Sequence, residues 1–162
     1  MACPEVNSFT KRVRREQGQA RQLKENDGCF LLAVPIRNTG EEKFVMNIEK
    51  MRQRLKSCSA GRAGMILVHN GVVRNTSRAG DKVSQIQVSV NWEKLEEVMK
   101  EARRLPGVIA VEVEVREGVL QVGEDIMLLG IAGDIRENTI AAMAHVLDRI
   151  KKEVTFKKES MA

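Results

Sequence analysis

Five basic residues stand at the ends of segments whose apolar residues recur with a regular period. Arg74 follows a strand-like apolar run, Arg136 precedes the last helical pattern, and Lys151, Lys157 and Lys158 come after that helix. Arginines hold phosphate in bidentate fashion, and a lysine whose pKa is lowered by neighbouring cations can act as a nucleophile or an acid–base group. These cations would form a phosphate site if the fold brought them together. Composition and spacing alone favour a plainer interpretation, in which the basic stretch after the helix is a solvated tail.

The rest of the sequence offers few other catalytic or metal-binding patterns. It has no glycine-rich phosphate loop, no GxSxG motif, and no histidine, cysteine or carboxylate cluster with metal-ligand spacing. His69 lies in an apolar strand pattern and His145 beside the stripe of the last helix, so both are predicted to be structural or surface residues. Cys3, Cys29 and Cys58 are odd in number and far apart, which indicates reduced thiols. We therefore expect no metal and no cofactor.

Alternating patterns predict the strands that must position the cations. Residues 83–90 alternate apolar and polar side chains, and residues 108–118 do so with Glu112 and Glu114 on the face opposite the valines. Apolar runs predict three further strands. In the run at residues 29–36, Pro35 indicates an edge or a strand end, and in the run at residues 64–73, Gly71 indicates a bulge. The run at residues 123–132 predicts a strand buried on both faces.

Helical periodicity appears at residues 47–56, with Asn47 as a predicted N-cap, and at residues 92–104. The predicted apolar stripe of the last helix is Ile140, Met143, Ala144, Leu147 and Ile150. From residue 64 onward the order is strand, strand, helix, strand, strand, helix. This order predicts an α+β fold.

Length and charge limit the remaining possibilities. A chain of 162 residues is the size of one domain, and its net charge of +5 favours an anionic partner. A basic run at residues 11–15 has two interpretations, a nucleic-acid arm or a surface helix. Acidic residues at positions 16, 25 and 27 interrupt the charge and favour the surface helix, so no nucleic acid is expected. No signal peptide or membrane span is recognisable, and we expect a cytoplasmic protein that does not contact a membrane.

Three stretches in their order, GMILVHNGVVRN, VEVREGVLQVGEDIMLLGIAG and the last helix running into KKEVTFKKE, resemble the large subunit of molybdopterin synthase, the MoaE family. The resemblance implies a MoaE-like α/β-hammerhead-type fold, with a mostly antiparallel sheet and helices packed on it. It also implies a division of the chain into an N-terminal extension, residues 1–42, and a large-subunit-like domain, residues 43–162.

The function implied by the resemblance is a step of molybdenum cofactor biosynthesis. In that family sulfur passes from a small ubiquitin-like subunit, whose C-terminal Gly-Gly carries a thiocarboxylate, to cyclic pyranopterin monophosphate, which gives molybdopterin. The large subunits form a homodimer, and two small subunits complete a heterotetramer. The reaction needs no metal or redox cofactor.

Matching the family motifs by position gives each of the five cations a role. The resemblance implies that Lys151 is the reactive lysine, that Lys157 assists it in proton transfer, and that Arg74 and Arg136 bind substrate. The tail lysine of the family falls on Lys157 if one gap is allowed and on Lys158 if none is, so Lys158 is also a candidate for substrate binding.

Two departures from the family pattern leave a second interpretation open. Ile135 stands where the family has a histidine before Arg136, and the tail segment TFKK lacks the family tryptophan. The chain would then be a non-catalytic paralogue of the same fold that serves as a ligand-binding or regulatory module.

Overall fold

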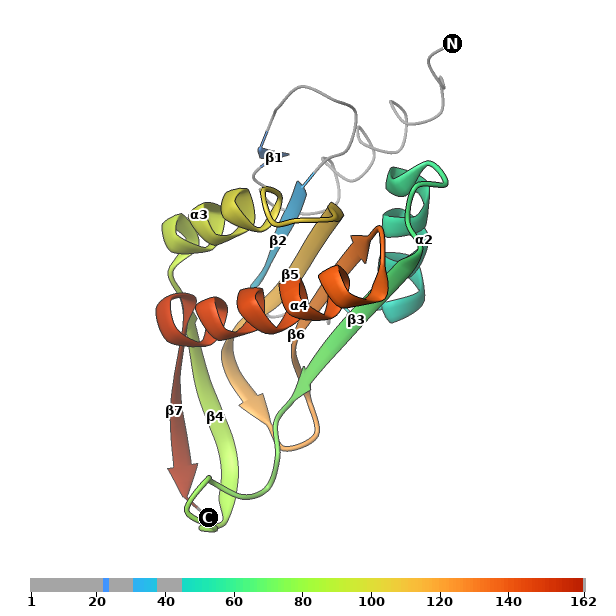
Figure 1. The fold of residues 1–162 in the computed structure, drawn as a ribbon. Helices are drawn as coiled ribbons and strands as arrows, with labels where there is room; N and C mark the ends of the chain where they lie inside the picture. Colours follow the sequence, from blue (N-terminus) through green and yellow to red (C-terminus); the bar gives the residue numbers. More distant parts are fainter. Residues whose placement is uncertain (1–21, 24–30, 38–44, 162) are drawn as a thin grey trace.

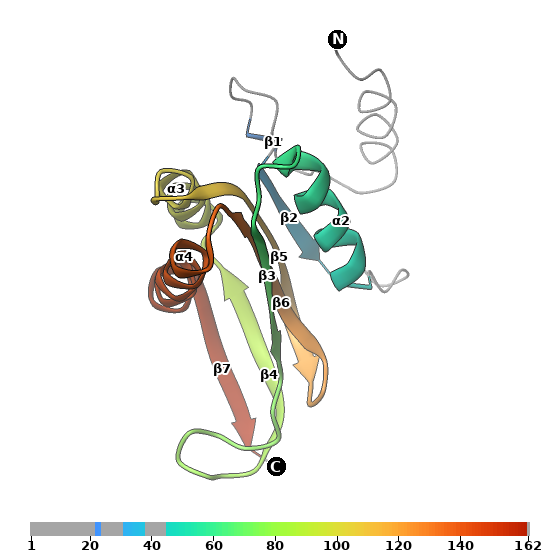
Figure 2. The same ribbon diagram turned by 45° about the vertical axis from the view of Figure 1, so that its right-hand side comes forward.

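A twisted sheet with helices on both faces forms the core of the protein (Figure 1). The computed structural model describes residues 22–23 and 31–37, by their backbone, and residues 45–161. The basic N-terminal run, Cys3 and Cys29 lie outside these residues. Helices α3 (Trp92–Ala102) and α4 (Arg136–Arg149) lie on one face of the sheet, and α2 (Ile48–Ser59) lies on the other (Figure 2). The strands are β1 (Gln22–Leu23), β2 (Leu31–Arg37), β3 (Met65–Val72), β4 (Val83–Val90), β5 (Val108–Gln121), β6 (Asp125–Gly133) and β7 (Thr155–Met161).

Asparagine side chains fix the starts of α2 and α3. Asn47 Oδ1 accepts a hydrogen bond from the backbone N–H of Lys50 at 2.9 Å, and Asn91 Oδ1 accepts one from the N–H of Lys94 at 3.1 Å. Each bond satisfies an amide that the first turn of a helix leaves without a partner. The predicted N-cap at Asn47 is therefore confirmed.

The long strand β5 organises the sheet because it has different partners along its two edges. One edge pairs with β6 in antiparallel fashion, and β3 continues the sheet beyond β6. The other edge pairs first with β2, in parallel, over residues 113–117 and then with β4, antiparallel, over residues 118–121. Gly118 stands at this change of partner with a φ of +108°, which glycine adopts without strain. Strand β7 adds to β4 in antiparallel fashion. The sheet is mostly antiparallel and carries helices, which confirms the predicted α+β fold.

Smaller features of the predicted strands are confirmed as well. The register of β3 against β6 shifts between Gly71 and Val72, which is the predicted bulge. Strand β6 is buried on both faces over nearly its whole length. In β2, Pro35 pairs with Val115 of β5, and β1 pairs only with Leu31 and Leu32, so among the described residues no strand lies beyond Pro35.

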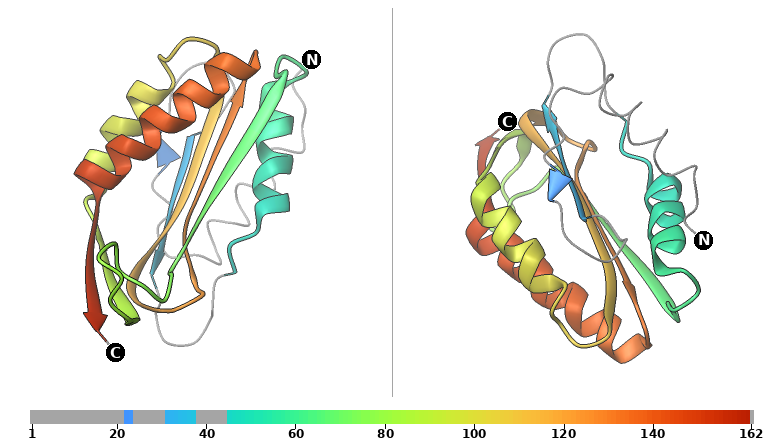
Figure 3. Two further views of the ribbon diagram at one scale, coloured as in Figure 1. Left: turned by 60° about the horizontal axis from the view of Figure 1, so that its bottom comes forward. Right: turned by 90° about the horizontal axis from the view of Figure 1, so that it is seen from above.

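Two hydrophobic cores lie on the two faces of the sheet. Beneath α3 and α4, the valines of β5 and β4 pack against apolar residues of both helices, which run side by side over the sheet (Figure 3). Beneath α2, a smaller core joins Met51 and Leu55 to Leu128 of β6. Glu112 and Glu114 alternate with the valines as predicted, but α2 covers them, and they are only 4% and 3% exposed.

The predicted apolar stripe of the last helix is partly wrong. Met143 and Ile150 are buried as expected, but Ile140 is 49% exposed and Ala144 is also exposed. The buried stripe instead begins at Thr139, whose hydroxyl would overlap a Cβ placed on Gly133 of β6. Thr139 and Gly133 are both small, so α4 approaches the sheet closely where they meet. The helix therefore turns Thr139 toward the sheet, and part of the more hydrophobic predicted stripe faces solvent. The other buried residues of α4 are Ala142 and Val146. No helix in the described ranges is long and apolar enough to cross a membrane.

Candidate functional site

A π-helical turn, η1 (Ile150–Val154), ends α4 and turns the chain into β7. Ile150 and Val154 are fully buried and anchor the turn in the core beneath α3 and α4. The backbone N–H of Asn91, at the start of α3, donates to the carbonyl of Val154 at 2.8 Å. Lys151, which lies between these anchors, is exposed. Its backbone is therefore fixed by the core while its side chain reaches solvent.

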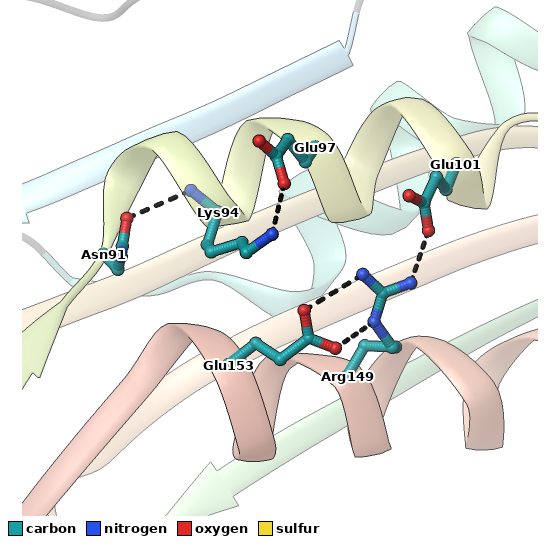
Figure 4. Close-up of polar contacts among 6 residues, drawn as sticks. All are labelled: Asn91, Lys94, Glu97, Glu101, Arg149 and Glu153. Atoms are coloured by element: carbon teal, nitrogen blue, oxygen red, sulfur yellow. Dashed lines mark hydrogen bonds and ion pairs between the residues drawn. The ribbon is translucent and has the colours of Figure 1, made fainter.

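Arg149 stabilises the same turn through hydrogen bonds to carboxylates (Figure 4). Its guanidinium donates to Glu153 within η1 and to Glu101 on α3, and it thereby joins the end of α4 to its neighbour helix. The hydrogen bonds to these carboxylates raise the pKa of Arg149, and the bond from Arg149 lowers the pKa of Glu153. Arg149 and Glu153 are thus held in their ionised forms. The network fixes the position of the turn that carries Lys151.

The register of β7 against β4 separates the two tail lysines. Lys157 pairs with Val88, which is buried in the core beneath α3 and α4, whereas Lys158 pairs with Gln87, which is exposed. Residues directly opposite one another in an antiparallel pair share a face, and successive residues alternate. Lys157 therefore lies on the face of the sheet that carries α4, and Lys158 lies on the other face.

Lys157 is the centre of a group of positive charges. Desolvation lowers its pKa first, and the charges of Lys151, Arg74 and Arg78 lower it further, while Glu159 acts in the opposite sense. A lysine with a lowered pKa has a larger neutral fraction near neutral pH and can exchange protons with a bound molecule.

His69 of β3 belongs to the same group. It is half-buried, and its pKa is lowered by burial and then by the charges of Lys151 and Lys157. We call Arg74, Arg78, Lys151, Lys157 and His69 the cationic cluster. Strand alternation could have found His69 from the sequence, because it shares a face with Leu67 and lies five residues before Arg74. The sequence motifs by themselves single out neither His69 nor Arg78 as a site residue.

Arg136 does not join the cationic cluster within one chain. It begins α4, and Lys151 follows the other end of that helix, so about 20 Å of helical rise separates them. The Arg136 guanidinium is exposed and pairs with the adjacent Glu137 at 2.9 Å. Ile135, at the position of the family histidine, is 53% exposed.

The arrangement suits an anionic ligand. Four positive side chains and one imidazole gather from β3, the following loop, η1 and β7, and guanidinium and ammonium groups bind phosphate oxygens strongly. Among the side chains that the structure describes, no three His, Cys, Asp or Glu residues lie close enough together to hold a metal ion.

Comparisons with known proteins agree with the resemblance seen in the sequence. Residues 42–153 match the family model described as MoaE protein, which is more than half of the chain. The fold is similar to the molybdopterin synthase structure from Staphylococcus aureus, with 24% identity, a TM-score of 0.60, and 72% of this chain and 86% of that chain covered.

Two further solved structures share the fold. The molybdopterin biosynthesis MoaE protein from Burkholderia ambifaria is 21% identical, with a TM-score of 0.63, over 80% of this chain and 83% of that one. A complex of subunits 1 and 2 of molybdopterin-converting factor from Helicobacter pylori contains a chain 18% identical, with a TM-score of 0.55, over 70% of this chain and 77% of that one. The sequence has no significant match among curated proteins. On the strength of the family match and the shared fold, the chain belongs to the MoaE protein family.

Proposed function

We propose that this protein is the large subunit of a molybdopterin synthase and acts in the cytoplasm. It would transfer sulfur from the thiocarboxylate of a small ubiquitin-like subunit to cyclic pyranopterin monophosphate. Membership of the MoaE family supports a role in molybdenum cofactor biosynthesis. The observation that carries the proposal is the cationic cluster, in which the charge of Lys151 on η1 acts on Lys157 of β7.

The residues of the cluster divide into two roles in this proposal. Arg74 and Arg78 supply fixed positive charge and bind the substrate phosphate. Lys157 moves protons, because its lowered pKa lets it alternate between charged and neutral forms. Lys151 contacts the reacting carbon as the nucleophile or the charge partner. Lys158 is less suited to bind the same ligand, since it lies on the opposite face of β7.

Assembly would complete the site. The Helicobacter pylori relative is described as a complex of two subunits, which supports a small partner subunit for this chain as well. Arg136 lies at the far end of α4 and can bind the same substrate only if a second copy of the chain brings it there. This is the reason to propose a homodimer and, with two small subunits ending in Gly-Gly, a heterotetramer. The N-terminal extension to residue 42 remains a predicted addition to the domain at residues 43–162.

A second function is favoured by one specific observation, the exposed Ile135 at the position of the family histidine. Without that imidazole the chain could bind a pterin phosphate and fail to transfer sulfur, as a non-catalytic binding or regulatory paralogue would. His69 supplies an imidazole to the cationic cluster from another element, and this favours the enzyme.

Sulfur transfer can be measured directly. The purified chain is mixed with a thiocarboxylated small subunit and cyclic pyranopterin monophosphate, and molybdopterin formation is followed. We expect product that is lost in Lys151→Ala and Lys157→Ala and retained in Lys158→Ala, the matched control on the opposite face. If the wild-type chain binds the substrate and forms no product, the binding paralogue is the correct interpretation.

A further inference from the structure

His69 occupies a position of β3 that faces the helices. Leu67, two residues earlier, packs against the core beneath α3 and α4, and strand residues two apart share a face. Val88, the strand partner of Lys157, belongs to that same core, so His69 and Lys157 lie on one face of the sheet. A Cβ placed on Gly71 would lie 3.5 Å from His69 Nε2. The imidazole therefore leans along β3 toward the end of the strand, where the loop with the cluster arginines begins.

The charges that act on the imidazole are positive. Lys151 acts on it from η1 and Lys157 from β7, and together with partial burial they keep the pKa of His69 below its ordinary value of 6.5. Arg74 and Arg78 act in turn on Lys157. At pH 7 the imidazole is therefore neutral, and one of its nitrogens is a proton acceptor.

Glu159 partly offsets the charge at Lys157, but the charges that act on the imidazole itself are those of Lys151 and Lys157. Asp125 of β6 accepts a hydrogen bond from Asn70 Nδ2 at 2.9 Å, and Asn70 lies on the opposite face of β3 from the imidazole. The residue of β6 directly opposite the imidazole is Leu129, which is uncharged. Asp148 at the end of α4 and Glu159 on β7 are both exposed. Among the described residues no carboxylate acts on the imidazole, so a bound anion would bring negative charge to it.

We propose that His69 takes up a proton when a phosphate monoester binds to the cationic cluster, so that an imidazolium joins Lys151 and Lys157 in holding the dianion. The inference rests on the proposed function, because it assumes that the cluster is the phosphate site. It adds a proton-coupled binding residue that comes from β3 and not from the start of α4, where the family pattern places its histidine.

Linkage gives the proposal its measurable form. A bound dianion cancels the positive charge that opposes protonation of His69, and by reciprocity a protonated His69 strengthens anion binding. Affinity for a dianion should therefore rise as the pH falls, by at most about tenfold per pH unit for one linked proton. Sulfate is the suitable probe because it keeps both charges in this range, whereas a phosphate monoester itself takes up a proton near about pH 6.

The test uses the full chain, the two anions and the two histidines. The ring protons of His69 and His145 are followed by NMR across about pH 6 to about pH 8, without and with saturating sulfate. Dissociation constants for sulfate, and for inorganic phosphate at about pH 8, are measured by calorimetry. His145→Gln is the matched control, since His145 is exposed on α4. His69→Gln keeps every lysine and arginine, so the difference from wild type isolates the imidazole.

The expected result is an upward shift of the His69 titration by about one pH unit in sulfate, with no comparable shift of His145. Sulfate affinity should increase about three- to tenfold from about pH 8 to about pH 6 in wild type and in His145→Gln, and clearly less in His69→Gln. Sulfate binding without a shift of His69 would overturn the inference and leave the proposed phosphate site intact. Equal shifts of both histidines, or no binding of either anion, would also overturn it, and the sulfur-transfer assay judges the proposed function separately.

Discussion

Replacing Arg54 on α2 tests how the chain keeps two carboxylates inside the protein. Arg54 Nε donates to Glu112 Oε1 and Nη2 donates to Glu114 Oε1, each at 2.7 Å. Both glutamates are almost fully buried, and Glu114 Oε2 is buried with no hydrogen-bond partner. Arg54→Ala leaves two buried charges without a cation. Breaking a buried ion pair in this way typically costs about 3–5 kcal/mol of unfolding free energy, and we expect a loss in that range at neutral pH.

The pH dependence of the loss identifies its cause. Burial already raises the pKa of Glu112 and of Glu114, against the lowering effect of Arg54. A carboxyl whose pKa is raised on folding contributes stability at low pH that is lost as the pH rises through the folded-state pKa. Without Arg54 both pKa values rise further, so the variant should fall furthest behind wild type at alkaline pH and partly recover at mildly acidic pH.

Urea unfolding at about pH 5 and about pH 8 measures this dependence. The control is Arg52→Ala on the same helix, because Arg52 is 45% exposed and pairs only with the neighbouring Glu49 among the described salt bridges. An exposed pair of this kind is screened by solvent and contributes little to stability. The reasoning would be refuted if Arg54→Ala lost no more than Arg52→Ala at about pH 8, or if its deficit were the same at both pH values.

Three further variants, two of them with a matched control variant, test the tail, the sheet and the turn. Since the pKa of Lys157 is lowered on folding, its charge destabilises the fold as the pH falls. Lys157→Met should therefore raise the free energy of unfolding at pH 7 by up to about 1 kcal/mol after solvent screening. Lys158→Met should not raise it, and thermal denaturation of both variants measures the difference. Gly64→Ala should cost about 1–3 kcal/mol in urea unfolding because its Cβ would overlap a backbone carbonyl oxygen. In the control Gly71→Ala the new Cβ would have no neighbouring atom closer than 3.5 Å, and stability should change by less than about 0.5 kcal/mol. Equal losses in Gly64→Ala and Gly71→Ala would contradict the expected overlap at Gly64. Arg149→Ala should lower the melting temperature slightly, because it removes the hydrogen bonds to Glu101 on α3 and Glu153 on η1. An unchanged melting temperature would show that the turn is held by its buried residues alone.

Much of the fold could be predicted from the sequence because local rules decide it. The period-two pattern of residues 83–90 and the Asn47 cap each depend only on nearby residues, and both predictions are confirmed. The orientation of α4 could not be predicted in this way. It depends on the contact of Thr139 with Gly133 on another element, which brings a less hydrophobic stripe against the sheet than the periodicity suggested.

The candidate site shows the same division. The sequence pointed to Lys151, Lys157 and Arg74 as candidates through motifs and their order, and these motifs are local stretches of chain. It could not choose between Lys157 and Lys158, because one residue of strand register decides which side chain faces α4. Strand alternation can place His69 on the face of Leu67, but the charges that act on this imidazole come from residues more than eighty positions away, and no local pattern shows them.

By itself, the sequence determined the kinds of elements, their order, the family of the chain and the types of charge available to a ligand. These properties follow from side-chain identity and from apolar patterns that repeat every two residues in strands or every 3.6 residues in helices. Such patterns can be recognised within a short stretch of sequence. Only the tertiary structure decided which face of the sheet each charge occupies, that Glu112 and Glu114 are buried against Arg54, and that His69 joins the two lysines. The physical reason is that burial and charge–charge interaction depend on distance in space, and the sheet pairing sets that distance between residues far apart in the chain.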